Sequence, residues 1–185
     1  MEKEIETRFL DIDKEKLAKE LGELGAIDKG EEKLEEIIFH PADKSWIGKR
    51  KFVRLRKTKN KIKLTYKENV EQTADSAREI EFEVPDWDKC VEFLSKLGLE
   101  PMRQLEKYRH TFVLGDVTID IDTWPKIPAY AEIEGSSVES LKAVSEKLHM
   151  DWEKRFDGDA REVFRRYGYN LDEIVVITFS ELKYK

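Results

Sequence analysis

Apolar and charged residues alternate in short stretches along much of the chain. In a β-strand, successive side chains point to opposite faces, so strict alternation separates an apolar face from a charged one. The triplet Glu-Ile-Glu, which occurs at 4–6, 79–81 and 132–134, shows this most clearly. On this pattern, strands are predicted over 3–10, 35–40, 52–58, 61–68, 78–84, 106–114, 117–123 and 129–134. The chain is therefore expected to contain a sheet of about eight strands.

Leucine-rich segments with helical spacing lie between several of these strands. Aspartate is a favoured N-cap, and glycine is a favoured residue just beyond the end of a helix. Three helices are predicted between such pairs, namely Asp13 with Gly25, Asp86 with Gly98, and Asp159 with Gly168. A further helix is predicted over 138–149. All of them need apolar surface to pack against, which the apolar strand faces can supply.

The order of elements repeats once. A Glu-Ile-Glu triplet, a leucine-rich helix ending in Leu-Gly and a run of alternating strands occur from residue 4 and again from residue 79. This weak repeat of about 75 residues is far longer than a solenoid period. It predicts one domain over 1–185 with two similar halves, 1–77 and 78–170, and a C-terminal extension over 171–185. The apolar run at 174–179 is expected either to add an edge strand or to mediate pairing of two copies.

Composition narrows the classes of function. Charged residues make up 40% of the chain and the net charge is -6, which opposes generic nucleic-acid binding. Basic residues gathered locally in an acidic protein instead predict a pocket for a compact polyanion. Cys90 is the only cysteine, which excludes an intrachain disulfide and a cysteine-based zinc site. No apolar run approaches the roughly 18 residues of a membrane span, so a soluble, cytoplasmic protein is expected.

The charged faces of the predicted strands are each mainly of one sign. Glu79 and Glu81 share one face, for example, whereas Arg54 and Arg56 share another. For any single strand, an ordinary sheet with its charged face in water is the simpler interpretation. Taken together, the strands favour a closed or nearly closed barrel, in which apolar faces meet helices outside and charged faces line the lumen.

Such a lumen would need cations to balance its carboxylates. Two carboxylates at i and i+2 lie about 7 Å apart and repel by about 2 kcal/mol at an effective dielectric near 20. Lysines and arginines on neighbouring strands supply some positive charge, and a divalent metal can supply the rest. Carboxylate ligands without cysteine and with few histidines favour Mg²⁺ or Mn²⁺. Paired arginines, in turn, suit phosphate oxygens.

The N-terminal Glu4-Ile5-Glu6-Thr7-Arg8 resembles the Glu-x-Glu-x-Lys signature of the CYTH superfamily, the triphosphate tunnel metalloenzymes. The similarity continues in order through the motifs at 53–56, 64–67, 78–81, 107–109, 119–122 and 131–134. The family includes class IV adenylyl cyclases, thiamine triphosphatases, inorganic triphosphatases and fungal-type RNA triphosphatases. The resemblance implies an α+β fold: an eight-stranded antiparallel β-barrel with a charged lumen, the triphosphate tunnel, and helices packed outside.

The resemblance also implies roles for individual residues. The metal-binding carboxylates would be Glu4, Glu6, Glu79, Glu81, Asp120, Asp122, Glu132 and Glu134. The first and third triplets would converge at one metal, with the middle triplet on the opposite wall. The substrate-binding cations would be Arg8, Arg54, Arg56, Lys63, Lys67, Lys107 and Arg109, with Arg165 or Arg166 assisting from the C-terminal region. The catalytic group would be Glu4, Glu6, Arg8 and Lys67.

Arg8 departs from the family pattern, because it stands where the signature has lysine. Charge is kept, but a planar fork replaces a point donor, so a different local phosphate geometry is expected.

Three functions are open at this point. The leading hypothesis is Mg²⁺- or Mn²⁺-dependent hydrolysis of inorganic triphosphate, a nucleoside triphosphate or thiamine triphosphate. The alternative is class IV adenylyl cyclase activity, which converts ATP to cyclic AMP and pyrophosphate with the same wall charges. The third is a polyphosphate- or nucleotide-binding module without turnover, which the three acidic triplets oppose because a binder needs mainly the basic strands. The expected partner is a triphosphate-containing small molecule, and the protein is expected to be a monomer or homodimer.

Overall fold

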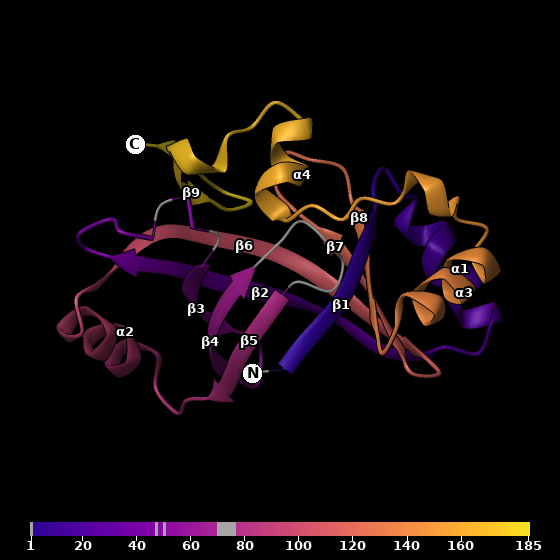
Figure 1. Cartoon of the computed structure of the whole chain (residues 1–185), viewed down its shortest axis with the longest axis horizontal. Coiled ribbons are helices and arrows are strands. Elements are labelled where there is room, and N and C mark those ends of the chain that lie inside the picture. Colours follow the sequence, from indigo (N-terminus) through magenta and orange to yellow (C-terminus); the bar gives the residue numbers. More distant parts are fainter. Residues whose placement is uncertain (1, 47, 50, 70–76) are drawn as a thin grey trace.

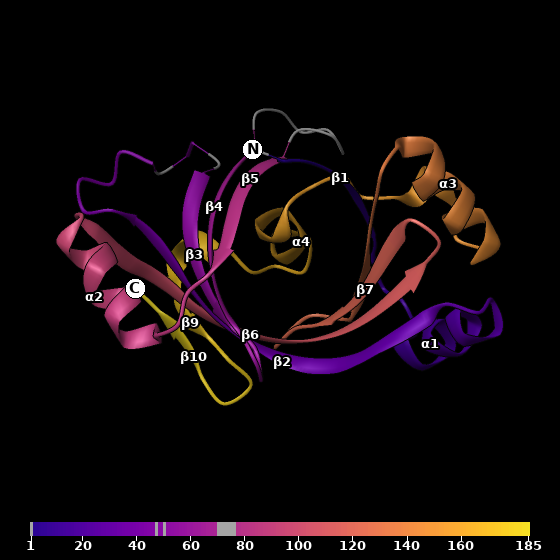
Figure 2. The same cartoon turned by 90° about the horizontal axis from the view of Figure 1, so that it is seen from below.

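The computed structural model describes residues 2–46, 48–49, 51–69 and 77–185, and describes no side chain at 2–4, 69 and 77. Eight strands carry the architecture: β1 (Glu2–Phe9), β2 (Ile27–Pro41), β3 (Lys51–Lys57), β4 (Ile62–Asn69), β5 (Ala77–Glu83), β6 (Leu99–Leu114), β7 (Val117–Thr123) and β8 (Tyr130–Gly135). They pair in the order β6-β2-β3-β4-β5-β1-β8-β7, and β7 pairs back to β6. All eight pairings are antiparallel. The expected eight-stranded antiparallel barrel is confirmed, and Figure 2 shows the sheet curling around its lumen.

Two strands are much longer than the alternation predicted. β2 begins at Ile27 instead of residue 35, and β6 begins at Leu99 instead of residue 106. The first six residues of β2 are exposed, so they have no apolar side to mark them in the sequence. The added part of β2 pairs with the part of β6 that the alternation predicted, and the added part of β6 pairs largely with the predicted part of β2. Tertiary pairing, which no local pattern reports, therefore sets their length.

The helices begin where the sequence predicted, three of them directly after the expected aspartate caps and the third in chain order after Ser137. Asp13, Asp86, Ser137 and Asp159 cap α1 (Lys14–Glu23), α2 (Trp87–Lys96), α3 (Val138–Lys147) and α4 (Ala160–Arg166), each accepting a backbone N–H of the first turn. Each half of the ring has the same order of elements, a strand, a helix and three strands. Among the described residues, no helix is long and apolar enough to span a membrane.

The apolar strand faces pack against helices on the outside of the barrel. Ile119, Ile121 and Ile133 are buried in a cluster with leucines of α1 and α3, and Val53 and Leu55 are buried with residues of α2. Burying one such side chain contributes roughly 1.5–3 kcal/mol, so these contacts fix which face of each strand points outward. The alternating charged faces consequently point into the lumen.

The C-terminal segment closes one end of the barrel. β9 (Ile174–Ile177) pairs in parallel with β6, and β10 (Leu182–Tyr184) pairs with β9, so the extension adds edge strands as one of the two expectations had it. Val163 and Phe164 of α4 pack in an apolar cluster with Trp124 and Tyr130. In Figure 1 α4 lies above the sheet, and in Figure 2 it lies within the outline of the barrel. It therefore covers one end of the tunnel.

Candidate active site

The lumen holds a cavity of about 150 Å³ whose described lining contains nine lysines and arginines but four aspartates and glutamates. The cations are Arg8, Lys51, Arg54, Arg56, Lys67, Arg103, Lys107, Arg109 and Arg161. The carboxylates are Glu6, Glu36, Glu132 and Asp159. Most come from alternate positions of the barrel strands, as the charged faces predicted. The cavity is thus locally basic inside a chain of net charge -6.

Arg8 joins two strands at one wall. It lies opposite Glu132 in the β1–β8 register, and its Nη2 is 3.0 Å from Glu6 Oε1 and also contacts Glu132 Oε2. Its Nη1 donates to the carbonyl of Gly158, 2.8 Å away. Burial lowers the pKa of Arg8, but Glu132 and Glu6 outweigh it and raise the pKa well above its usual value. Arg8 is therefore a permanently charged bridge between two carboxylates.

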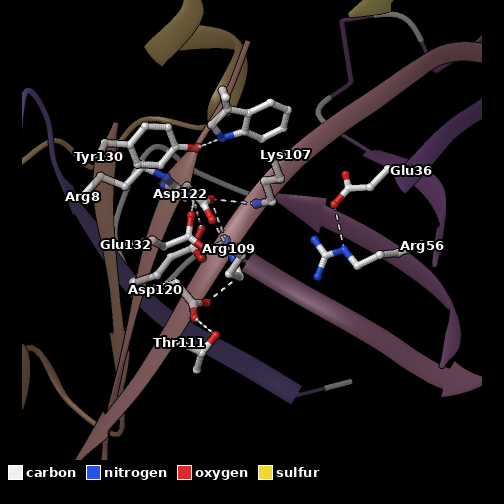
Figure 3. A network of polar contacts seen from close by, with 12 residues as sticks. Arg8, Glu36, Arg56, Lys107, Arg109, Thr111, Asp120, Asp122, Tyr130 and Glu132 are labelled. Atoms are coloured by element: carbon white, nitrogen blue, oxygen red, sulfur yellow. Dashed lines mark hydrogen bonds and ion pairs between the residues drawn. The ribbon is translucent and has the colours of Figure 1, made fainter. Parts of the chain in front are cut away.

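Arg109 on β6 organises the neighbouring wall (Figure 3). It donates to both carboxylate oxygens of Asp122, at 2.7 and 2.8 Å, and to Glu132 at 3.0 Å, and it also contacts Asp120. Lys107 donates to Asp122 Oδ2 at 2.7 Å. Asp122 is fully buried, and both its oxygens are engaged by these two cations. Asp122 therefore holds Arg109 and Lys107 in place.

Glu132 is shared by Arg8 and Arg109. Burial raises the pKa of this carboxyl, but the two guanidinium groups outweigh that effect and hold it well below its usual range. Glu132 is consequently ionised at any physiological pH.

Glu36 on β2 is a buried carboxylate that the sequence analysis missed. Its Oε1 accepts from Arg56 Nε at 2.7 Å, on the wall across the ring from β1 (Figure 3). Burial raises the pKa of Glu36, but Arg56 and Arg54 outweigh it and the pKa falls to about 2. The signal was present, because outward Ile37 and Phe39 in the predicted strand 35–40 place Glu36 inward.

The triplets are arranged differently from the expectation. Glu6 lies opposite Glu134 in the β1–β8 register, so the first and third triplets are side by side. The middle triplet is on β5, which pairs with the other edge of β1. The expectation that this triplet lies on the opposite wall is therefore wrong. β5 and β8 are the two strands that pair with β1, and the strand across the ring from β1 is β2. Glu81 is held there by Lys63 and, at 2.8 Å, by Thr65 Oγ1.

Eight of the candidate residues line the cavity, and several of the others lie directly behind or beside them. Glu6, Arg8, Arg54, Arg56, Lys67, Lys107, Arg109 and Glu132 line the cavity. Asp120 and Asp122 lie behind them as partners of Arg109, and Lys63 pairs with Glu81. Glu79 lies opposite Lys67 in the β4–β5 register. The side chain of Glu4 lies outside the described residues.

The two arginines expected to assist from the C-terminal region do not line the cavity. Arg165 pairs with Asp172 at 3.1 Å and is more than half exposed, and Arg166 lies over the ring of Phe156. Arg161, one turn earlier on α4, lines the cavity instead. Packing of Val163 and Phe164 against the barrel end decides which face of α4 meets the lumen.

The donors of this site suit a hard divalent cation. Among the described side chains, no group of three or more His, Cys, Asp or Glu lies close enough to hold a metal alone. Mg²⁺, however, is usually bound by one or two carboxylates together with substrate phosphates and water. Glu6 and Glu132, both in contact with Arg8, provide such a pair. The residues present therefore fit a metal that binds together with its phosphate ligand.

Three buried guanidinium nitrogens of the lining have no hydrogen-bond partner among the described residues: Nε of Arg8, Nε of Arg54 and Nη2 of Arg103. Burial and the neighbouring Arg56 lower the pKa of Arg54, which indicates incompletely balanced positive charge. Both observations favour an anionic ligand.

Residues 2–167 match the sequence model of the CYTH domain. The chain belongs to the CYTH family. Its members bind triphosphates and include metal-dependent triphosphatases and adenylyl cyclases. No curated protein sequence matches the chain.

Several solved structures are similar to this chain in fold. PH1012 of Pyrococcus horikoshii OT3 is 25% identical, with 84% of this chain and 96% of that one covered and a TM-score of 0.72. An adenylate cyclase candidate from Vibrio parahaemolyticus is 15% identical, with 89% and 98% covered and a TM-score of 0.75. HpAC1 from Hippeastrum, an adenylyl cyclase candidate described as having a dominant triphosphatase activity, is 14% identical, with 90% and 96% covered and a TM-score of 0.64. The last two likenesses show the fold alone.

Proposed function

We propose that this CYTH protein is a Mg²⁺- or Mn²⁺-dependent triphosphatase, with inorganic triphosphate as its best-fitting substrate. The observation that carries the proposal is the basic cavity, with nine cations and four carboxylates in its described lining. A triphosphate supplies concentrated negative charge and many acceptor oxygens, which match guanidinium forks. The unpartnered nitrogens of Arg8 and Arg54 add donors that a phosphate oxygen can satisfy.

Cavity size favours inorganic triphosphate over a larger substrate. The cavity measures about 150 Å³, whereas pockets that enclose a drug-sized ligand typically measure roughly 300–1,000 Å³. A triphosphate moiety would fill the basic part, and a nucleoside or thiamine would extend beyond it. The apolar lining residues Leu105 and Trp124 favour the alternative, class IV adenylyl cyclase activity, because they offer a surface for a base. The size argument ranks that alternative second.

The side chains of the lumen have separable tasks in hydrolysis. Arg8, Arg109 and Lys67 would neutralise charge on the equatorial oxygens while water attacks the terminal phosphorus and its bond to the bridging oxygen breaks. Their ion pairs with Glu6, Glu132 and Asp122 hold them in place, so little reorganisation is needed during the reaction. A metal held by Glu6 and Glu132 would supply charge neutralisation and an acidified water. The leaving group is pyrophosphate.

A substrate panel with metal titration tests the proposal. Purified protein with Mg²⁺ or Mn²⁺ is expected to release orthophosphate from tripolyphosphate, faster than from ATP or thiamine triphosphate. Chelation by EDTA is expected to abolish the release. Pyrophosphate and cyclic AMP formed from ATP would instead identify the cyclase, and tight binding without any product would identify a binding module.

The variant Glu6→Gln, Glu132→Gln tests the assigned pair. Loss of both carboxylate charges is expected to lower kcat/KM for tripolyphosphate on the order of 100-fold, the effect of losing about 3 kcal/mol of transition-state stabilisation. Glu83→Gln is the matched control, because Glu83 pairs with Lys61 on the exposed surface. Equal activity of the double variant and the control would show that the metal assignment is wrong.

A further inference from the structure

The ammonium group of Lys107 contacts an aromatic ring as well as a carboxylate. Its Nζ donates to Asp122 Oδ2 at 2.7 Å (Figure 3) and lies over the ring of Trp124, 4.9 Å from the ring centroid. Asp122 and Trp124 are two residues apart where β7 ends, and both lie next to this one ammonium. The end of β7 therefore supplies two different contacts to a cation of the cavity lining.

Trp124 is itself held firmly. The residue is buried, and its Nε1 donates to Tyr130 Oη at 2.9 Å. Burial raises the pKa of Tyr130 well above its usual value, as do Asp122 and Glu132, so this phenol stays neutral. Phe164 of α4 meets the indole almost at a right angle, with ring centroids 5.4 Å apart. Close packing of this kind leaves the indole little freedom to turn.

Lys107 needs such support more than Arg109 does. A lysine carries a point charge on a flexible four-carbon stem, whereas an arginine presents a planar fork. Arg109 binds both oxygens of Asp122, and Lys107 shares one of them. Burial and Arg109 lower the pKa of Lys107, and Asp122 opposes that shift. A tryptophan face stabilises a cation most strongly where water is excluded, so the indole both restrains this ammonium and favours its charged form.

We propose that Trp124 is a positioning residue, which holds the ammonium of Lys107 toward the phosphate oxygens in the lumen. Tyr130 and Phe164 fix the indole, so the packing of α4 bears on a phosphate-binding cation through Trp124. The ring face that meets Lys107 is also closed to a stacked base, which favours a substrate without one. The inference rests on the proposed function in one respect, that Lys107 binds triphosphate.

Nuclear magnetic resonance of the ligand-free protein tests the contact. An aromatic ring shields nuclei that lie over its face, so the Cε protons of Lys107 are expected upfield of those of the other lysines. Lys107→Met identifies their resonance by its disappearance. Trp124→Leu is expected to abolish the upfield shift, and Trp124→Phe to keep part of it. A Lys107 resonance at the ordinary lysine position in the natural protein would overturn the proposal.

Calorimetric titration with tripolyphosphate in the absence of divalent metal measures the effect on binding. Trp124→Leu is expected to weaken the affinity about tenfold, the effect of losing a desolvated cation–π contact. Trp124→Phe is expected to restore most of it, because an aromatic face remains. Trp87→Leu is the matched control, since Trp87 of α2 packs in an apolar cluster outside the lining, and it is expected to leave the affinity within about twofold.

A double-mutant cycle distinguishes positioning from a purely structural role. In the Lys107→Met background, Trp124→Leu is expected to change the affinity by less than about twofold, because the ring has no ammonium left to hold. The same loss of affinity in both backgrounds would overturn the proposal, as would an unchanged affinity of Trp124→Leu in the natural background.

Failure of this inference can be told apart from failure of the proposed function. Tripolyphosphate binding with the expected coupling, but without release of orthophosphate when Mg²⁺ or Mn²⁺ is added, would contradict only the proposed function. Hydrolysis with independent effects of the Trp124 and Lys107 variants would contradict only this inference. A protein that neither binds nor hydrolyses tripolyphosphate would contradict both.

Discussion

Arg109 contacts Asp120, Asp122 and Glu132 in a part of the lumen where little solvent reaches. Removing one member of a buried ion pair is destabilising, because the remaining carboxylates stay buried away from water and no longer have a cation to balance their charge. Arg109→Gln is therefore expected to lower the free energy of unfolding by about 3–5 kcal/mol, measured by urea denaturation. Arg165→Gln, which breaks an exposed pair, is expected to change it by less than about 1 kcal/mol. Equal stabilities would show that the network does not stabilise the fold.

Glu36 makes stability depend on pH in a defined window. Its pKa falls from 4.5 to about 2 in the folded protein, so the folded state favours the ionised form. A depressed carboxyl pKa contributes stability above the unfolded pKa, and this stability is lost as pH falls toward the folded pKa. Between pH 4.5 and 2, Glu36 is expected to account for about 3 kcal/mol of the loss.

Urea midpoints measured across that window check the assignment. Glu36→Gln is expected to be less stable than the natural protein at pH 7 and to lose less stability on acidification. A parallel pH dependence in both proteins would assign the acid sensitivity to other carboxylates.

At the scale of elements, the segment that leads into α4 connects this helix, which covers one end of the tunnel, to Arg8 in the lumen. Arg8 and Phe156 exchange two backbone hydrogen bonds, at 3.1 and 2.8 Å, and Arg8 Nη1 donates to Gly158. A side chain at Gly158 would meet the ring of Phe156 at 2.6 Å and Glu162 at 2.7 Å. The segment at Phe156 and Gly158 therefore packs against both Arg8 and the first turn of α4.

Gly158→Ala tests this coupling. The clash is expected to destabilise the protein by about 1–3 kcal/mol and to lower kcat/KM for tripolyphosphate, because Arg8 loses its backbone anchor. Gly22→Ala is the control, since an added Cβ at Gly22 meets nothing within 4 Å and is expected to stabilise α1 by up to about 1 kcal/mol. Unchanged activity in Gly158→Ala would show that the segment before α4 does not position Arg8.

At the scale of the whole molecule, the ring of strands is closed unevenly. Among the described residues, β1 and β5 are joined through three pairs, Glu2 with Glu79, Lys3 with Arg78 and Glu4 with Ala77. β2 and β6, by contrast, are joined through a long pairing that extends from Ile27 to Pro41 on β2. Ile80 and Phe82 of β5 are also half exposed on the outer face. Within the described parts of the chain, β1–β5 is therefore the junction of the barrel with the fewest residue pairs.

Hydrogen exchange measures this difference. Amides of β5 are expected to exchange at least about tenfold faster than those at the centres of β2 and β6, since local opening there breaks few contacts. Tripolyphosphate is expected to slow the exchange of β5, because a ligand held by Arg8 and Lys67 ties β1 to β4 on both sides of it. Exchange in β5 as slow as in β6 would contradict the uneven closure.

Several features were readable from local sequence because their causes are local. The alternation around Ile133 and Leu55 located strands, and Asp13, Asp86 and Asp159 marked helix starts. The same alternation placed Arg54, Arg56 and Arg109 in the lumen. It does not distinguish Glu36, because a single inward glutamate between apolar residues forms no repeated motif.

Other features depended on residues far apart in the chain. The lengths of β2 and β6 follow from their pairing with each other. The middle triplet lies beside β1 because of strand order, which alternation does not encode. Arg161 rather than Arg165 or Arg166 lines the cavity because Val163 and Phe164 orient α4 against the barrel end.

The sequence by itself determined which face of each strand is charged, where the helices begin, and that the lumen combines carboxylates with arginines. These follow from side-chain periodicity and capping, which act over a few residues. Only the tertiary structure decided which carboxylate meets which arginine, that Arg8 bridges Glu6 and Glu132, and that α4 closes one end of the tunnel. Those contacts depend on strand order, register and packing between distant segments, and no pattern of neighbouring residues specifies them.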